Sequence, residues 1–229
     1  MNAVIGHTGF IGGILKKSVI GDYFNSKNIE DLKNKSYDTI YCAGVSAQKF
    51  YANRYPDEDK KKIDNLLQNI HGVKCKKFIL ISTISIYDDE SYGINRKEFE
   101  KNLIHLFGDK LLIVRLPAVY GEGMKKNLLF DMINNKLFSK INLHDKYQWY
   151  NVENIKTDID KIKDSSKRIV EFFPEPISNE ILISLFDKHF EFISDMDSAY
   201  IQNIIPSDGY YYSSDIVIKK LKKFIDGYR

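Results

Sequence analysis

Three glycines near the start of the chain are spaced at intervals of three. Gly6, Gly9 and Gly12 form a GxxGxxG pattern, which suits a tight turn, close approach of the backbone to a pyrophosphate, and close helix packing. Backbone N–H groups at the start of the next helix would bind the pyrophosphate. An ordinary glycine-containing turn is the weaker alternative, because the glycines lie between an apolar strand and a helix. The predicted cofactor contacts in this loop are Gly6, Thr8, Gly9, Phe10, Ile11 and Gly12.

The residues about 20 positions after the loop bear on which dinucleotide binds. NAD-binding proteins often place an acidic residue there to bond the ribose 2′-OH, whereas this chain has Asn25, Ser26 and Lys27. Neutral hydrogen-bonding side chains and a lysine would accept a 2′-phosphate. The sequence therefore favours NADP, with Asn25 and Ser26 as contacts, while Asp22 and Glu30 keep NAD open.

These residues need strands and helices to hold them, and the apolar pattern predicts both. The predicted strands are residues 1–6, 23–25, 38–44, 77–83 and 110–116, and the predicted helices are residues 10–19, 63–70, 92–107, 127–134 and 179–189. Strands that alternate with helices predict an α/β fold with a Rossmann-type, doubly wound parallel sheet. We expect the ligand at the carboxyl ends of the strands.

The alternation weakens after the first half of the chain. We predict that residues 1–124 form the dinucleotide-binding Rossmann domain and residues 125–229 a smaller, partly interleaved substrate-binding region. No Gly/Ser/Pro-rich linker marks a boundary. Lysines that alternate with apolar residues over 218–224 predict an amphipathic terminal helix with a solvated face, and we expect the aromatic cluster 210–212 in the core.

Composition narrows the class of ligand. The chain has 229 residues, 43% hydrophobic and 28% charged, as in soluble globular proteins. A net charge of +3 provides no basic field for nucleic acid, so we expect a small-molecule ligand. The sequence shows neither a signal peptide nor a membrane-spanning run, which predicts a cytoplasmic location and no membrane partner. Cys42 and Cys75 lack CxxC spacing and the histidines lie far apart, so we expect buried, unreactive thiols and no metal.

Further motifs follow in a fixed order along the chain. They are the glycine loop, DTIYCAG at 38–44, Asn65, ISTISIY at 81–87, YGINRKEFE at 92–100, RLPAVYGEG at 115–123 and NVENI at 151–155. Together they resemble the NAD-dependent epimerase/dehydratase family of the extended short-chain dehydrogenase/reductase superfamily, which acts on nucleotide sugars. The resemblance covers most of the chain and implies a nicotinamide cofactor and a nucleotide-sugar substrate. It also implies cofactor contacts at Ala43, Gly44 and Pro117.

The resemblance implies a catalytic site. In the family a Ser or Thr hydroxyl and a Tyr hydroxyl polarise the substrate oxygen, while a lysine supports the tyrosine and bonds the nicotinamide ribose. The matching positions are Thr83, Tyr92 and, in place of the lysine, Arg96. Hydride transfer to or from a carbinol carbon needs a proton partner such as Tyr92. Arg96 lies one helical turn after Tyr92, on the same face of the predicted helix, so its charge can reach Tyr92. The resemblance implies that it also reaches the nicotinamide ribose.

The chain departs from the family pattern in ways that narrow the chemistry. Arginine cannot release a proton and its planar fork fits differently from lysine. Only residues 88–91 separate Tyr87 from Tyr92, a shorter segment than the family carries. Dehydratases place an Asp-Glu pair where this chain has Ile84 and Ser85. Dehydration is therefore least favoured, which leaves an epimerase or a keto-sugar reductase.

The resemblance also implies substrate contacts. Ser85 follows the predicted hydroxyl residue, and Lys125, Lys126 and Asn127 lie where the family contacts the nucleotide diphosphate. A solvated helix start is the alternative for the two lysines. A non-catalytic or regulatory dinucleotide-binding protein is the competing hypothesis, because Arg96 and the short segment depart from the family. A homodimer is left open.

Overall fold

The computed structural model describes residues 1–136 and 140–228 and divides the chain into two compact units. The first contains residues 1–116 and 154–170, and the second contains residues 117–153 and 171–229. This division differs from the predicted one at residue 124. The reason is that helix α6 (Ile155–Ile162) contacts α1 (Phe10–Ser18) of the first unit, and Ile113 N–H donates to the Arg168 carbonyl at 2.8 Å.

A six-stranded sheet forms the centre of the first unit, in the order β10-β5-β4-β3-β1-β2. All neighbouring pairs from β5 to β2 are parallel. The strands are β1 (Asn2–Ile5), β2 (Gly21–Phe24), β3 (Ser36–Cys42), β4 (Lys74–Thr83), β5 (Leu111–Leu116) and β10 (Ile169–Glu171). Each strand expected from the sequence is present, and the Rossmann-type doubly wound fold is confirmed.

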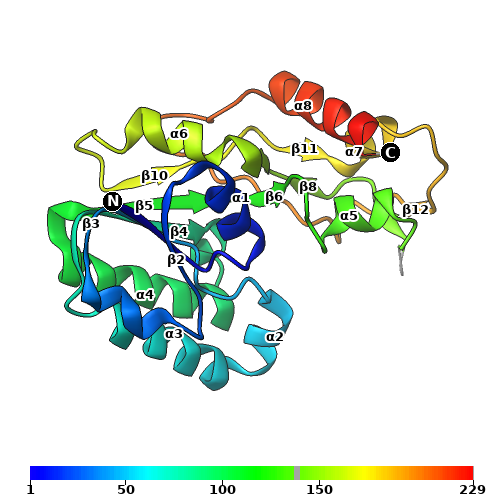
Figure 1. Cartoon of the computed structure of the whole chain (residues 1–229). Helices are drawn as coiled ribbons and strands as arrows, with labels where there is room; N and C mark the ends of the chain where they lie inside the picture. Colours follow the sequence, from blue (N-terminus) through cyan, green and yellow to red (C-terminus); the bar gives the residue numbers. More distant parts are fainter. Residues whose placement is uncertain (137–139, 229) are drawn as a thin grey trace. The chain divides into compact units, whose positions relative to one another are not determined.

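Helices cover both faces of this sheet (Figure 1). Helices α3 (Pro56–Ile70) and α4 (Ser91–Phe107) pack together on one face, and α1 and α6 lie on the other. Residues buried between the layers include Ile40, Phe78 and Leu103. Burial on both faces explains why the strands are continuously apolar rather than alternating.

Two helices of the first unit differ from the sequence prediction. Helix α3 begins at Pro56, seven residues before the predicted start, because proline and acidic residues favour the first turn of a helix. The short helix α2 (Lys49–Arg54) was not predicted; it contacts both α3 and α4. A 3-10 helix, η1 (Ile29–Asn34), connects β2 to β3.

The strand order determines where a ligand can bind. The chain moves outward from β1 to β2 and then returns to β3 on the other side of β1. Connections that leave β1 and β3 in opposite directions open a crevice at the carboxyl ends of these strands. The glycine loop follows β1, and Ala43 and Gly44 follow β3, so both segments border this crevice.

The second unit is built from short strand pairs and helices. Strand β6 (Ala118–Tyr120) pairs in parallel with β9 (Trp149–Asn151), β7 (Ile141–Asn142) in parallel with β12 (Phe192–Ile193), and β8 (Lys146–Tyr147) antiparallel with β11 (Ile177–Ser178). Its helices are α5 (Leu128–Ile133), α7 (Asn179–Ser184) and α8 (Ser214–Gly227). The predicted terminal helix forms part of α8, which buries Val217 and Leu221.

The structure bears on two sequence predictions, the state of the two cysteine thiols and the lack of a membrane-spanning segment. Cys42 and Cys75 are free and buried, and burial raises the pKa of both thiols to about 11. Both are therefore protonated at neutral pH, as expected for unreactive thiols. Within residues 1–136 and 140–228, no helix has the length and apolar character required to cross a bilayer.

Candidate active site

The glycine loop has the geometry that its spacing predicts. Gly6 has a φ of +82°, a conformation that favours glycine. Its N–H donates to the Phe24 carbonyl at 2.8 Å, and Gly9 N–H donates to the Gly6 carbonyl at 2.9 Å. A Cβ on Gly12 would lie only 2.6 Å from the Gly6 carbonyl carbon, so glycine lets α1 pack directly against the loop.

The start of α1 is suited to an anion. Gly9 is the N-cap, no side chain caps this end, and the first turn contains no acidic residue. The first N–H groups of a helix lack partners within the helix, and the helix dipole favours negative charge there. The loop and α1 therefore fit the pyrophosphate of a dinucleotide. Thr8 and Gly9 are exposed at this position.

An asparagine-rich turn follows β2 beside the loop. Asn25 Oδ1 accepts from Lys27 N–H at 2.8 Å, and Asn28 Oδ1 accepts from Asn25 N–H at 2.8 Å. Asn25 Nδ2 lies 3.3 Å from His7 Nε2, which brings Asn25 to the glycine loop. Ser26 and Lys27 are exposed on this turn.

The acidic residues that kept NAD open lie elsewhere. Asp22 pairs with Ala3 in the sheet register, its carboxylate bonds Lys35 at 2.8 Å, and the Lys35 hydrogen bond lowers its pKa. Tyr37 also donates to it, at 3.2 Å. Glu30 is exposed on η1. Asp22 is therefore already paired with protein groups.

Thr83 ends β4, where the 3-10 helix η2 (Ile84–Tyr87) begins. Its Oγ1 accepts from Ser85 N–H at 3.2 Å and caps η2. A Cβ on Gly93 would lie 2.9 Å from the Ser85 carbonyl carbon, so Gly93 allows α4 to pack onto η2. Tyr92, the second residue of α4, is buried next to this contact.

Arg96 contacts Tyr92, as the helical spacing predicts, but it is also bonded to other groups. The guanidinium carbon lies 3.8 Å from the centroid of the Tyr92 ring. Its two terminal nitrogens form a two-pronged ion pair with Asp59, and one Nη2–Oδ1 distance is 2.8 Å. Further bonds reach the carbonyls of Ser46 at 2.6 Å and Tyr92 at 3.1 Å. A ribose contact through these nitrogens would require one of these bonds to break.

Asp59 was not identified from the sequence. It is 3% exposed and also accepts from Asn95 Nδ2 at 2.9 Å. Hydrogen bonds from Arg96 and Asn95 outweigh the opposing effect of burial and lower the pKa of Asp59. Asp59 and Arg96 are 37 residues apart, and acidic residues are common at helix starts, so no local signal distinguished Asp59.

A second ion pair joins Glu100 of α4 to Arg115 of β5. Glu100 is 3% exposed and accepts from Ser82 Oγ at 2.5 Å and Arg115 Nη2 at 2.7 Å. Arg115 also donates to the Tyr87 hydroxyl at 3.0 Å. Glu100 and Arg115 belong to the motifs YGINRKEFE and RLPAVYGEG, so these two motifs also contain the partners of this ion pair. The network connects α4 to the ends of β4 and β5.

The remaining predicted residues belong to the second unit. Pro117 is buried, and Lys125 and Lys126 are exposed at the start of the α5 region. Although the surface of Lys126 is exposed, desolvation by neighbouring groups lowers its pKa. Asn127 caps α5 by accepting from Phe130 N–H at 2.8 Å, and its Nδ2 donates to the Val119 carbonyl at 2.9 Å. Asn127 therefore has a structural role at this helix start.

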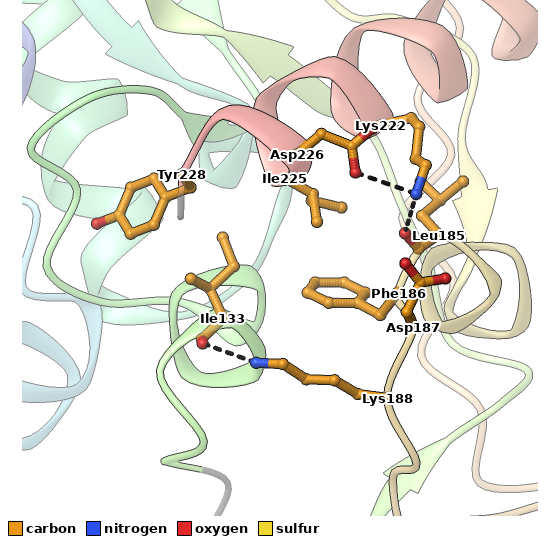
Figure 2. A pocket seen from close by; sticks show the side chains of 9 residues that line it. All are labelled: Ile133, Leu185, Phe186, Asp187, Lys188, Lys222, Ile225, Asp226 and Tyr228. Atoms are coloured by element: carbon orange, nitrogen blue, oxygen red, sulfur yellow. Dashed lines mark hydrogen bonds and ion pairs between the residues drawn. The ribbon is translucent and has the colours of Figure 1, made fainter.

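The second unit also contains a cavity of about 230 Å³ (Figure 2). Ile133 and Phe186 form part of its apolar wall. At its edge, Lys188 Nζ bonds the Ile133 carbonyl at 3.2 Å and Lys222 pairs with Asp226 at 3.1 Å. None of the predicted site residues lines it. Across the described parts of the chain, no three His, Cys, Asp or Glu side chains group as a metal site.

Solved structures share this architecture over the whole chain. UDP-glucose 4-epimerase of Thermotoga maritima, solved with UDP-glucose, is 15% identical with a TM-score of 0.72, covering 100% of this chain and 99% of that one. The dTDP-4-dehydrorhamnose reductase of Bacillus anthracis, in complex with NADP, is 15% identical with a TM-score of 0.74 and the same coverage. MoeE5, in complex with UDP-glucose and NAD, is 13% identical with a TM-score of 0.69, covering 98% and 97%.

The similarity lies in structure rather than in sequence. No protein-family model matches the chain, and no curated protein matches its sequence. The fold is a Rossmann-type α/β fold with the architecture of these epimerase and reductase structures. Two of these structures are an epimerase and a keto-sugar reductase, the two kinds of enzyme that the sequence resemblance implied.

Proposed function

We propose that the protein is a nicotinamide-dinucleotide-dependent enzyme that acts on nucleotide sugars, as an epimerase or a keto-sugar reductase. The observation that carries the proposal is the position of Tyr92. Tyr92 lies at the start of α4, which the close approach of Gly93 to Ser85 holds against η2. The sheet that α4 covers has a dinucleotide-type glycine loop at the end of β1. The full-length likeness to epimerase and reductase structures supports it.

The cofactor would supply or accept the hydride, and the protein would bind it and provide the proton. The glycine loop and α1 would hold the pyrophosphate, with Ala43 and Gly44 beside them at the end of β3 and Pro117 as a further contact. Tyr92 would exchange the proton with the substrate oxygen, and Thr83 would polarise the same oxygen. Arg96 would act through its contact with the Tyr92 ring.

We propose NADP as the preferred dinucleotide. Ser26 and Lys27 are exposed on the turn that Asn25 holds against the glycine loop, and Asp22 is already paired with Lys35. An ammonium and a hydroxyl on this turn suit a 2′-phosphate.

Replacing Lys27 with alanine tests this preference. We expect the Kd for NADPH to rise about tenfold, which corresponds to about 1.4 kcal/mol, because the variant loses a cation for the 2′-phosphate. The Kd for NADH should stay within about twofold, because NADH lacks that phosphate. Titration calorimetry with both dinucleotides measures the change, and Lys33→Ala is the matched control, because Lys33 is an exposed lysine on η1. Equal loss of affinity for both dinucleotides would contradict the assignment.

We also propose the nucleotide-sugar contacts that the sequence resemblance implies. Lys125 and Lys126 would contact its diphosphate, Asn127 would position them by capping α5, and Ser85 would contact the sugar. UDP-glucose is the first probe, because it is bound in two of the solved structures. The cytoplasmic location and the homodimer remain predictions from the sequence.

Replacing Tyr92 with phenylalanine tests the chemistry. General acid–base catalysis contributes about 10² to 10⁴ in rate, so turnover should fall at least about 100-fold. Dinucleotide binding should persist, because the ring and its contact with Arg96 are retained. NMR of UDP-glucose detects epimerisation, and loss of NADPH absorbance with a dTDP-4-keto-sugar detects reduction. Tyr55→Phe is the control, because Tyr55 is exposed and has no assigned role. Wild-type turnover in Tyr92→Phe would remove the assignment.

One observation favours the competing hypothesis of a non-catalytic dinucleotide-binding protein. The terminal nitrogens of Arg96 already bond Asp59, Ser46 and Tyr92. A ribose could bond them only if one of these hydrogen bonds were broken. Tight binding of NADPH or NADH, without turnover of UDP-glucose or of a dTDP-4-keto-sugar, would support this alternative.

A further inference from the structure

The short segment before Tyr92 is anchored by a helix that lies far from it in the sequence. Residues 88–91 separate Tyr87, the last residue of η2, from Tyr92, and the last of them, Ser91, is the first residue of α4. Lys49, the first residue of α2, pairs with Asp88 Oδ2 at 2.9 Å and with Glu90 Oε2 at 2.6 Å. One ammonium group therefore bonds two carboxylates of a four-residue segment.

The same helix also bonds the backbone of Tyr92. Asn53 Oδ1 accepts from Tyr92 N–H at 2.8 Å, and the Asn53 side chain also bonds Glu90. Lys49 and Asn53 are four residues apart, so they lie on one face of α2. The N–H of Tyr92 is in the first turn of α4 and has no partner within that helix, so Asn53 satisfies it.

These interactions persist at neutral pH. Although burial acts in the opposite direction, hydrogen bonds to Glu90 and Asp88 raise the pKa of Lys49 to about 12. The hydrogen bond from Lys49 lowers the pKa of Glu90. Both partners are therefore charged across the range in which activity would be measured.

We infer that α2 is a positioning element for Tyr92, and that it acts through Lys49 on the preceding segment and through Asn53 on the Tyr92 backbone. The inference rests on the proposed function in treating Tyr92 as the proton donor. A segment of four residues has little structure of its own, so contacts from α2 determine where α4 begins. A displacement of about 1 Å at a reacting group can reduce a rate about 100-fold.

The test compares two lysines of similar exposure that form ion pairs with residues at or near α4. Lys49→Met removes the anchor, and Lys49→Arg keeps a cation there. Lys60→Met is the matched control, because Lys60 bonds Glu98 of α4 at 2.5 Å. The side chains of Lys49 and Lys60 are 40% and 42% exposed. Lys49→Met loses two exposed ion pairs and Lys60→Met loses one, each with a small effect on thermal stability. Only Lys49→Met releases the segment before Tyr92.

Two measurements decide the inference. Amide hydrogen exchange of a peptide covering residues 88–92 should become faster in Lys49→Met, remain unchanged in Lys60→Met, and return towards the wild-type rate in Lys49→Arg. With UDP-glucose or a dTDP-4-keto-sugar, kcat should fall about tenfold in Lys49→Met while the Kd for NADPH stays the same. Lys49→Arg should recover most of the activity, and Lys60→Met should retain it.

The outcomes separate this inference from the proposed function. Unchanged exchange in Lys49→Met, or faster exchange with unchanged kcat, overturns the positioning role. An inactive wild-type protein contradicts the proposed function instead, and the exchange measurement then decides alone whether α2 fixes Tyr92.

Discussion

Replacing Asp59 with alanine is expected to lower the free energy of unfolding by about 3 to 5 kcal/mol. The Arg96 and Asp59 side chains are each 4% exposed, so the variant leaves a guanidinium buried without its counter-ion. The Asn95 amide also loses an acceptor at 2.9 Å. Removal of one partner from a buried pair costs more than the pair contributes, because the remaining charge stays desolvated. Urea denaturation at neutral pH measures the difference.

The pH dependence of this effect has a definite sign. The pKa of Asp59 in the folded protein is lowered from its usual 3.8, so its stabilising contribution is present above that value. The contribution is lost as the pH falls through the lowered pKa. The stability difference between wild type and Asp59→Ala should therefore decrease below about pH 4.

Asp57 provides the matched control for Asp59→Ala. It lies in the same first turn of α3 but is exposed, so Asp57→Ala should cost at most about 1 kcal/mol through the helix dipole. The double variant Asp59→Leu/Arg96→Met removes both charges and should be more stable than Asp59→Ala. Equal stability of Asp59→Ala and Asp57→Ala would show that the buried pair contributes nothing.

The sequence predicted the parts of the site that depend on local pattern. The spacing of Gly6, Gly9 and Gly12 after an apolar run correctly indicated a strand, a tight turn and a helix. The helical spacing of Tyr92 and Arg96 correctly indicated contact between them. Both arguments rest on distances along one element, which the period of a helix or a strand determines.

The sequence did not predict the parts that depend on distant pairing. Lys49, Asn53 and Asp59 bond groups 36 to 41 residues away, and nothing in their neighbours identifies these partners. Helix α2 has only six residues, and its Phe50 is 80% exposed, so it lacks the apolar face that reveals a helix. The return of residues 154–170 to the first unit also depends on residues far apart in the sequence, because it rests on the contacts of α6 with α1.

Replacing Gly12 with alanine should reduce both stability and dinucleotide binding. The new Cβ would lie well inside van der Waals contact of the Gly6 carbonyl, 2.6 Å from its carbon and 3.1 Å from His7 Cα. These atoms are backbone and cannot rotate away, so α1 must move off the glycine loop. Overpacking of this kind costs about 1 to 3 kcal/mol. The displaced N–H groups should raise the Kd for NADPH at least about tenfold.

Gly13→Ala is the control for Gly12→Ala, because it should change the free energy of unfolding in the opposite direction. A Cβ on Gly13 would meet only the His7 carbonyl oxygen at 3.7 Å, an ordinary contact, and both glycines lie within α1. Alanine in a helix is about 0.5 to 1 kcal/mol more favourable than glycine, so Gly13→Ala should raise the free energy of unfolding and leave the Kd for NADPH unchanged. Urea denaturation and calorimetric titration measure both variants. If Gly12→Ala also stabilises the protein, the close packing of α1 on the loop does not exist; if it destabilises without weakening NADPH binding, the loop does not bind the pyrophosphate.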